Sequence, residues 1–365
     1  MQKRYVAFGI VLLAVAGLLI ARYELAGRPQ PLPPEPGGGP SAEVATVLAG
    51  GLEIPWALAF LPGGDMLITE RPGRIRLYEA ATGLVEEPLF EIDDVVYRGE
   101  GGLLGIAVHP EFEEHPYVYV YYTYQEGQAL ANRVARYTLT ERSLIDRQVL
   151  LAALPGANIH NGGRLKFGPD GCLYITTGDA ATPNLAQQID SLAGKILRLA
   201  DDGSIPADNP FAGSPVFSYG HRNPQGLALD DEGRLWSTEH GQTATDEVNL
   251  IQPGANYGWP VIRGDEATDG LESPFLHSGN DTWAPSGVGY VDASLFFAGL
   301  RGGSLFEVQL PSGHLVRHLQ GWFGRLREVV VGPDGNLYLL TSNRDGRGVP
   351  VASDDRLIRV DLERL

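Results

Sequence analysis

The sequence contains a single cysteine, Cys172, so no disulfide can form within the chain. Cys172 lies in an apolar stretch, which favours a small core residue over a reactive thiol. Positive charge is also scarce, because 28 Lys and Arg stand against 45 Asp and Glu and give a net charge of -17. Such an acidic chain repels phosphate backbones, so we expect no nucleic-acid partner.

Helical periodicity is also missing from the sequence after about residue 42. Residues 186–192 could form one or two helical turns and are the only helical segment that we expect there. Glycine and proline are abundant, with 47 and 26 residues, which is typical of a turn-rich β protein. Hydrophobic residues make up 43% of the chain, as in an ordinary globular domain.

A long apolar run covers residues 5–21 and follows two basic residues. It predicts either a signal peptide or an uncleaved membrane anchor within residues 1–27, although neither Ala21 nor Ala26 has the small partner two residues earlier that an Ala-x-Ala cleavage pattern needs. Either alternative implies an exported body that lies in the periplasm or another extracytoplasmic space, with residues 5–21 as its possible membrane contact. Residues 28–41 are rich in proline and glycine and predict a linker, which leaves residues 42–365 as the folded domain.

From about residue 42 the chain repeats one theme six times, with a degenerate fifth unit. Each unit has an apolar strand, a turn in which Pro, Asp and Gly recur, a second strand that ends in Thr or Glu, and a strand that mixes Arg with aliphatic residues. One such sheet cannot bury both faces alone, but sheets stacked radially in a ring can. We therefore predict an all-β fold, a six-bladed β-propeller, in which residues 43–48 add a strand to the last blade.

His160 lies in a glycine-rich loop, residues 158–164, directly before the hairpin of the third unit. The second strand of that hairpin ends at Asp179, at the same end as the loop, so its carboxylate could reach the imidazole. A base oriented by a carboxylate is a common catalytic arrangement. A surface histidine beside a turn is the alternative interpretation of this stretch alone.

Other polar loops occupy the equivalent place in their units, where the loops of a propeller converge at one end of the ring. They contain Arg222, Gln225, Arg301, Arg325 and Arg327. In an acidic protein, this concentration of guanidinium and amide donors suits a ligand with several carboxylates. Salt bridges between blades are the alternative explanation for the arginines.

Four stretches together resemble one family: residues 102–110, 160–164, 222–227 and 325–327. They are similar to the soluble, pyrroloquinoline-quinone (PQQ)-dependent aldose sugar dehydrogenases of the glucose/sorbosone dehydrogenase family, over about residues 45–362. The resemblance implies a six-bladed propeller, a PQQ cofactor with three carboxylates, and a Ca2+ ion that clamps it. It also implies oxidation of the C1 hydroxyl of an aldose sugar to a lactone by hydride transfer, with an external quinone or cytochrome as electron acceptor.

The resemblance implies roles for individual residues as well. His160 matches the general base, Asp179 the carboxylate that orients it, and Arg222 the residue that stabilises the developing oxyanion. The other implied positions are cofactor contacts at Asn223, Gln225, Thr282, Arg301, Arg325 and Arg327, a sugar contact at Glu100, and calcium-binding backbone carbonyls at Gly241 and Gln242.

The chain departs from the best-known glucose enzymes of that family at two positions. His277 and Asn280 stand where those enzymes have a tyrosine and a tryptophan. The insertions that support their dimers are also absent here. We therefore expect a monomer that resembles the shorter, broad-specificity aldose members.

Two other functions stay open at this point. A six-bladed calcium-dependent lactonase would need open carboxylate ligands, and Asp246 and Glu247 are the acidic pair near the candidate calcium loop. A non-catalytic propeller that binds a protein or glycan is the other possibility, because propellers serve many functions. Reconstitution with quinone and calcium would separate all three.

Overall fold

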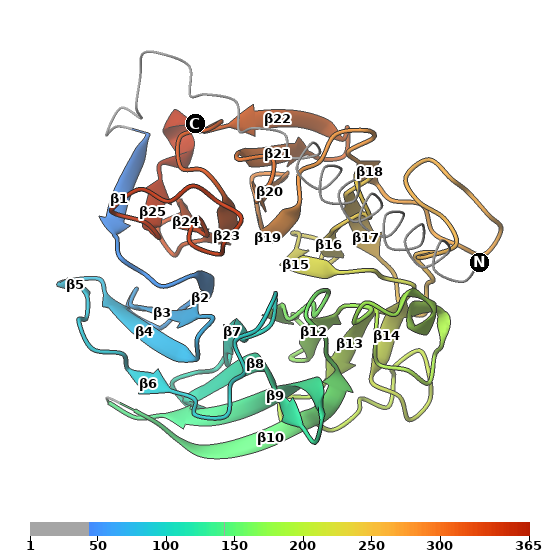
Figure 1. The fold of residues 1–365 in the computed structure, drawn as a ribbon, viewed down its shortest axis with the longest axis horizontal. Helices are drawn as coiled ribbons and strands as arrows, with labels where there is room; N and C mark the ends of the chain where they lie inside the picture. The colour runs from blue at the N-terminus through green and yellow to red at the C-terminus, as the bar shows by residue number, and fades with distance from the viewer. Residues whose placement is uncertain (1–43, 142) are drawn as a thin grey trace, which may run out of the picture. The chain divides into compact units, whose positions relative to one another are not determined.

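The computed structural model describes residues 44–141 and 143–365, which form six antiparallel sheets and two short 3-10 helices. The sheets follow one another around a ring, as the blades of a propeller do (Figure 1). The expected signal or anchor (residues 1–27) and the linker (residues 28–41) lie outside the described residues. Across 44–141 and 143–365, no helix has the length and apolar character needed to cross a membrane.

Each blade is built from consecutive strands, except that the first strand of the described chain joins the last blade. Blade one contains β2 (Pro55–Phe60), β3 (Met66–Glu70), β4 (Arg74–Glu79), β5 (Gly83–Leu84) and β6 (Phe90–Glu91), and blade two contains β7 (Leu103–Val108), β8 (Tyr117–Glu126), β9 (Ala129–Leu139) and β10 (Leu144–Pro155). Blade three contains β11 (Leu165–Phe167), β12 (Leu173–Thr177), β13 (Lys195–Leu199) and β14 (Val216–Tyr219), and blade four contains β15 (Pro224–Leu229), β16 (Leu235–Glu239), β17 (Glu247–Ile251) and β18 (Leu276–His277). Blade five contains β19 (Pro285–Val291), β20 (Ser294–Gly299), β21 (Leu305–Gln309) and β22 (His314–His318), and blade six contains β23 (Leu326–Val331), β24 (Leu337–Thr341), β25 (Leu357–Val360) and β1 (Ala45–Ala49).

Two sets of contacts close the ring. The inner strands touch in the order β2, β7, β11, β15, β19 and β23, and β23 touches β2 again. In blade six, β1 pairs antiparallel with β25, with Ala45 opposite Val360. The strand predicted at residues 43–48 is thus confirmed at Ala45–Ala49, where it joins the start of the domain to its end.

The threonines that recur at the end of the second strand link neighbouring blades. The Thr69 hydroxyl on β3 donates to the backbone carbonyl of Leu104 in blade two, at 2.6 Å. The Thr238 hydroxyl on β16 donates to the carbonyl of Ser286 in blade five, also at 2.6 Å. Because these hydroxyls are fully buried, each bond satisfies a polar group that would otherwise be costly inside the core.

The apolar core lies between blades rather than in one central mass. Trp56, Tyr121 and other side chains of blades one to three form the largest cluster. Cys172 packs with Tyr174 and Leu227 between blades three and four and is only 8% exposed. The interpretation of Cys172 as a small core residue is therefore confirmed.

The structure corrects two expectations about local structure. Helical conformation occurs at η1 (Pro183–Gln187), earlier than the predicted residues 186–192, because Pro183 starts the turn and Lys195 fixes its end. The buried Lys195 ammonium donates to three backbone carbonyls, two of which belong to Leu185 and Ala186 at 3.0 Å.

The fifth blade is a regular four-stranded sheet, although its sequence suggested a degenerate unit. Its first hairpin turns at Asp292 and Ala293, whose φ angles of 49° and 58° both lie in the left-handed region. Two such residues are typical of a tight hairpin turn, where Asn-Gly or Asp-Gly is the usual sequence. The turn therefore lacks the glycine signal that marks the first turns of blades one, three, four and six.

Candidate functional site

The loop that carries His160 is held in an unusual backbone conformation. His160 has φ 59°, in the left-handed region that is uncommon for residues with a side chain. A β-carbon on Gly178 would lie 2.0 Å from the His160 carbonyl oxygen, so only glycine lets the two segments cross. Local strain of this kind concentrates at functional sites, and here it directs the His160 side chain toward the end of β12.

Asp179 follows β12 and holds the His160 ring, as the sequence predicted. Its Oδ1 accepts hydrogen bonds from His160 Nδ1 and from the Ala181 backbone N–H, both at 2.8 Å. Its Oδ2 accepts from the indole Nε1 of Trp259 at 2.9 Å, and its side chain is fully buried. Because a carboxylate only accepts, Nδ1 carries a proton, and in the neutral ring Nε2 then keeps its lone pair, which is the form of a general base.

Arg222 lies in the loop before β15, beside this pair. Its backbone carbonyl accepts from the Asp179 N–H at 2.8 Å, which ties blade four to blade three. Its Nη1 donates to the backbone carbonyl of His240 at 3.1 Å, and its guanidinium lies 5.4 Å from the ring of Trp259. Burial lowers the pKa of Arg222, and its Nε has no hydrogen-bond partner among the described residues.

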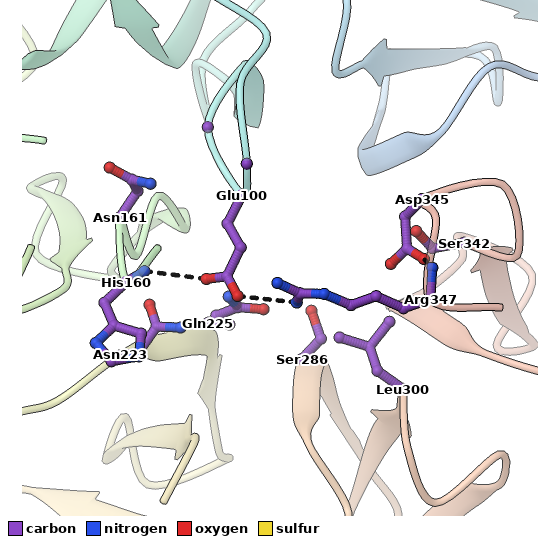
Figure 2. A network of polar contacts seen from close by, with 12 residues as sticks. Glu100, His160, Asn161, Asn223, Gln225, Ser286, Leu300, Ser342, Asp345 and Arg347 are labelled. Carbon is purple, nitrogen blue, oxygen red and sulfur yellow. Dashed lines mark hydrogen bonds and ion pairs between the residues drawn. The ribbon is translucent and has the colours of Figure 1, made fainter. Parts of the chain in front are cut away.

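Blades three to six contribute further donors to the same place (Figure 2). Asn223 accepts the Gly162 N–H at 3.0 Å through Oδ1, while its Nδ2 is buried without a partner in the described chain. Arg327 donates through Nη1 to Gln225 at 2.7 Å and to Ser286 at 3.2 Å. Burial lowers the pKa of Arg327 to about 9, which is the signature of a cation held away from water.

Several buried polar atoms of this region share one property: no described residue satisfies them. They are Arg164 Nη2, Arg222 Nε, Asn223 Nδ2, His240 Nε2 and Arg327 Nε. Each such atom costs on the order of 1–3 kcal/mol when it stays unpaired. Native cores satisfy most buried polar groups, so a cluster of exceptions indicates a ligand with several acceptor oxygens.

The other two arginines of the predicted set behave differently. Arg325 forms an ion pair with Asp345 at 2.9 Å and donates to the backbone carbonyls of Leu300 and Ser342. Arg301 is exposed, and its side chain takes part in none of the hydrogen bonds or ion pairs found for residues 44–141 and 143–365. Their implied contacts with a cofactor stay predictions, and in this structure Arg325 links the loops of blades five and six.

Glu100 lies between His160 and an arginine from the opposite side of the ring (Figure 2). Its Oε2 accepts the His160 backbone N–H at 3.0 Å, and its Oε1 pairs with Arg347 Nη1 at 2.9 Å. Although burial opposes it, these two donors hold the pKa of Glu100 down to about 2. Arg71 stabilises the loop that carries Glu100 by donating to the backbone carbonyls of Gly99 and Gly101.

Asp246 organises the loops of blades four and five that carry the predicted calcium site and Thr282. One oxygen accepts the Gly241 N–H at 2.9 Å. The other accepts the backbone N–H groups of Trp283 and Ala284 and the Thr282 hydroxyl at 2.7, 2.8 and 3.2 Å. The Asp246 carboxylate is therefore saturated, and in this structure the Thr282 hydroxyl points to it.

The predicted calcium ligands lie in a very tight turn. A β-carbon on Gly241 would meet the carbonyl oxygens of Ala244 and Thr245 at 2.0 and 2.5 Å. The backbone oxygens of Gly241 and Gln242 accept none of the hydrogen bonds formed within the described part of the chain. Two adjacent free carbonyls suit Ca2+, which prefers oxygen ligands.

Three residues of the site escaped the sequence analysis: Arg71, Trp259 and Arg347. Arg71 directly follows β3, and Trp259 lies in the long loop between β17 and β18. The Gly-Trp-Pro sequence at residues 258–260 is the one signal that could have drawn attention, since an aromatic residue in a glycine-rich turn often packs at a site. Nothing in the sequence pattern distinguishes Arg347 from an ordinary surface arginine.

Comparison with protein families agrees with this geometry. The sequence model of the glucose/sorbosone dehydrogenase family matches residues 52–358 of this chain. The chain belongs to the glucose/sorbosone dehydrogenase family. It is therefore an oxidoreductase of the aldose sugar dehydrogenase type, and the family resemblance seen in the sequence is confirmed.

Relatives of this glucose/sorbosone dehydrogenase family member include solved structures and curated enzymes. The PQQ-bound aldose sugar dehydrogenase from Streptomyces coelicolor is 41% identical with a TM-score of 0.82, over 89% of this chain and 99% of that one. The aldose sugar dehydrogenase YliI of Escherichia coli is 33% identical over 86% of this chain and 94% of its own. The quinoprotein glucose dehydrogenase B of Acinetobacter calcoaceticus is 36% identical over 60% of this chain and 52% of its own.

Proposed function

We propose that this family member oxidises the anomeric C1 hydroxyl of aldose sugars to lactones, with PQQ as the hydride acceptor and Ca2+ beside it. One observation carries the proposal: buried donors without partners in the described chain, among them Arg222 Nε and Asn223 Nδ2, lie in the loop that contacts the segments of His160 and Asp179. PQQ offers three carboxylates and two quinone oxygens, which are acceptors of the kind that these donors lack. The name of the PQQ-bound relative from Streptomyces coelicolor supports the same assignment.

The residues that would hold these groups can be named from the structure. Arg222, Asn223 and Arg327 would donate to the cofactor oxygens through their free N–H groups, and the carbonyls of Gly241 and Gln242 would bind calcium. When bound, the quinone supplies the hydride acceptor and calcium the Lewis acid that polarises it.

The site geometry supports the following part for the protein itself in the proposed reaction. His160 Nε2 takes the proton of the C1 hydroxyl while the C1–H leaves as hydride, and the C1–O bond becomes the lactone carbonyl. The buried Asp179 carboxylate holds the ring in the required tautomer and stabilises the imidazolium that forms. Arg222 stabilises the negative charge that develops at the reacting oxygens, and Glu100 accepts hydrogen bonds from sugar hydroxyls.

The lactonase alternative receives little support from its proposed ligands. Asp246 already accepts four hydrogen bonds. Burial, with the neighbouring Glu239 charge, raises the pKa of Glu247 to about 8, so this group is mostly protonated near neutral pH. Neither residue offers the open carboxylate that a catalytic lactonase calcium needs.

Reconstitution tests the proposed function. The purified protein should reduce a redox dye with a panel of aldoses only when both PQQ and Ca2+ are added, and a chelator present during loading should prevent it. His160→Ala should lower turnover by several orders of magnitude while quinone binding persists, whereas His314→Ala, an exposed histidine on β22, should match the wild type. No sugar-dependent dye reduction in the wild type would refute the proposal.

The same assay ranks the sugars. We propose aldoses as a class, without a preference for glucose, because His277 and Asn280 replace aromatic residues of the glucose enzymes and His277 is paired with Asp265 at 2.7 Å. Export, a monomeric state and an external electron acceptor remain part of the proposal, as the sequence predicts them. Size-exclusion chromatography with light scattering and cell fractionation would test the first two.

A further inference from the structure

One tryptophan outside the sequence motifs touches the base–carboxylate pair directly. Trp259 lies in the loop between β17 and β18 and is only 8% exposed. Its indole Nε1 donates to Oδ2 of Asp179 at 2.9 Å, while His160 Nδ1 takes Oδ1. An indole nitrogen can only donate, so this bond fixes which way the Asp179 carboxylate is turned.

The same indole borders two other parts of the site. The Arg222 guanidinium lies 5.4 Å from its ring centroid and the Arg263 guanidinium 5.5 Å from it. Arg263 in turn donates to the Gln242 side chain at 2.6 Å, in the loop that carries the proposed calcium ligands. Trp259 therefore contacts Asp179 and Arg222 and reaches the calcium loop through one intermediate residue.

The backbone of Trp259 is held from two blades. Its N–H donates to the Gly220 carbonyl at 2.9 Å, in the loop that leads to β15. Its carbonyl accepts from Gln187 Nε2 at 2.7 Å, and Gln187 and Asn256 exchange hydrogen bonds through their side-chain amides. Such bracing leaves the indole little freedom to leave Asp179.

We propose that Trp259 is a positioning residue for the general base. Its N–H keeps the Asp179 carboxylate in one orientation, which keeps the proton on Nδ1 of His160 and the lone pair on Nε2. Its ring also supports the Arg222 guanidinium. The effect on turnover rests on the proposed function, but the effect on the His160 tautomer does not.

A matched pair of substitutions tests the proposal. Trp259→Phe keeps an aromatic ring but removes the N–H together with part of the volume of the indole. Trp236→Phe removes the same kind of bond elsewhere, because Trp236 Nε1 donates to the buried Asp230 at 2.8 Å, in the turn that joins β15 to β16. Both variants lose one hydrogen bond from an indole of blade four to a carboxylate. Only Trp259→Phe loses the bond to Asp179, the carboxylate that orients His160.

The tautomer is read from the nitrogen chemical shifts of isotope-labelled histidine in the protein without quinone, with His160→Gln to assign the signal. In the wild type and in Trp236→Phe, we expect a protonated Nδ1 and a bare Nε2. In Trp259→Phe, both nitrogens should move toward averaged values. With quinone and calcium, turnover of Trp259→Phe should fall by about 10–100-fold, the usual effect of losing such a support, and the KM for the sugar should stay within about twofold of the wild type.

Wild-type shifts and wild-type turnover in Trp259→Phe would overturn the proposal. If that variant does not fold, Gln187→Met releases the Trp259 carbonyl and keeps the indole, and it should show the same averaging in weaker form. An unchanged tautomer there would also count against the proposal. If the wild type reduces no dye, the proposed function fails, while the tautomer comparison still decides the role of Trp259.

Discussion

Glu100→Gln should weaken the fold because one carboxylate joins two sides of the site. Gln can still accept the His160 N–H, but it cannot pair with Arg347. A pKa of about 2 instead of 4.5 corresponds to about 3 kcal/mol in favour of the ionised folded state. Because Arg347 is 55% exposed and water screens the pair, we expect a loss of about 1–2 kcal/mol at neutral pH.

The pH dependence of this loss has a definite sign. The folded pKa of Glu100 lies below the unfolded value, so its stabilisation is complete above 4.5 and disappears as the pH falls toward about 2. The stability difference between the wild type and Glu100→Gln should therefore shrink as the pH is lowered through that window. Urea unfolding followed by tryptophan fluorescence, at neutral pH and at several acidic values, measures the difference.

Arg347→Met serves as the partner variant. It leaves the Glu100 bond to His160 in place and removes only the exposed ion pair, so it should cost about 0.2–1 kcal/mol and be sensitive to salt. The assigned role of Glu100 would be refuted if the wild type and Glu100→Gln had the same free energy of unfolding at neutral pH. It would also be refuted if the difference between their free energies of unfolding widened as the pH falls.

Three further predictions concern the site itself. Asp179→Asn should lower turnover by about 100–10,000-fold, because the amide cannot accept hydrogen bonds from both His160 and the indole of Trp259. A reduced rate of dye reduction, in a variant that still binds quinone normally, would show this loss. Arg327→Met should leave the thermal midpoint of the quinone-free protein unchanged or higher, since it removes a buried cation, yet abolish the rise that quinone causes; exposed Arg301→Met should reduce that rise much less. Gly241→Val should destroy calcium-dependent quinone binding measured by fluorescence titration, because its β-carbon would meet the Ala244 carbonyl at 2.0 Å, and unchanged binding would argue against this calcium loop.

Local patterns in the sequence predicted most of the fold. Turns that contain both Asp and Gly located the hairpins of blades three, four and six, and the strand at Ala45–Ala49 was expected from the need to close a ring. The fifth blade was underestimated because its Asp292–Ala293 turn lacks glycine. A turn can be predicted from the sequence only where its backbone conformation requires a particular residue type. The Asp292–Ala293 turn uses residues that merely tolerate the left-handed conformation.

The candidate site was predictable where its parts are close in sequence. His160 and Asp179 flank one hairpin, and their 2.8 Å contact follows from that geometry. Trp259 and Arg347 reach the site from loops of other blades, and their positions depend on how the ring packs. No pattern in the sequence carries that information, so the support of the base could be found only in the structure.

The hydrogen-bond and ion-pair partners of the arginines could not be predicted from the sequence either. The sequence placed four arginines in similar loops, but burial separates them: Arg222 and Arg327 each keep a buried N–H without a partner in the described chain, Arg325 pairs with Asp345, and Arg301 faces solvent. Charge type alone cannot distinguish a ligand-binding guanidinium from one that stabilises neighbouring loops. The free N–H groups make that distinction.

The most direct test of the central claim is a single-turnover reaction of the protein loaded with PQQ and Ca2+, followed by quinone absorbance. An aldose should reduce the bound quinone, deuterium at C1 should slow the reduction, and His160→Ala should slow it by several orders of magnitude. A quinone spectrum that no aldose changes, or a reduction rate that neither C1 deuterium nor His160→Ala affects, would contradict hydride transfer at this site.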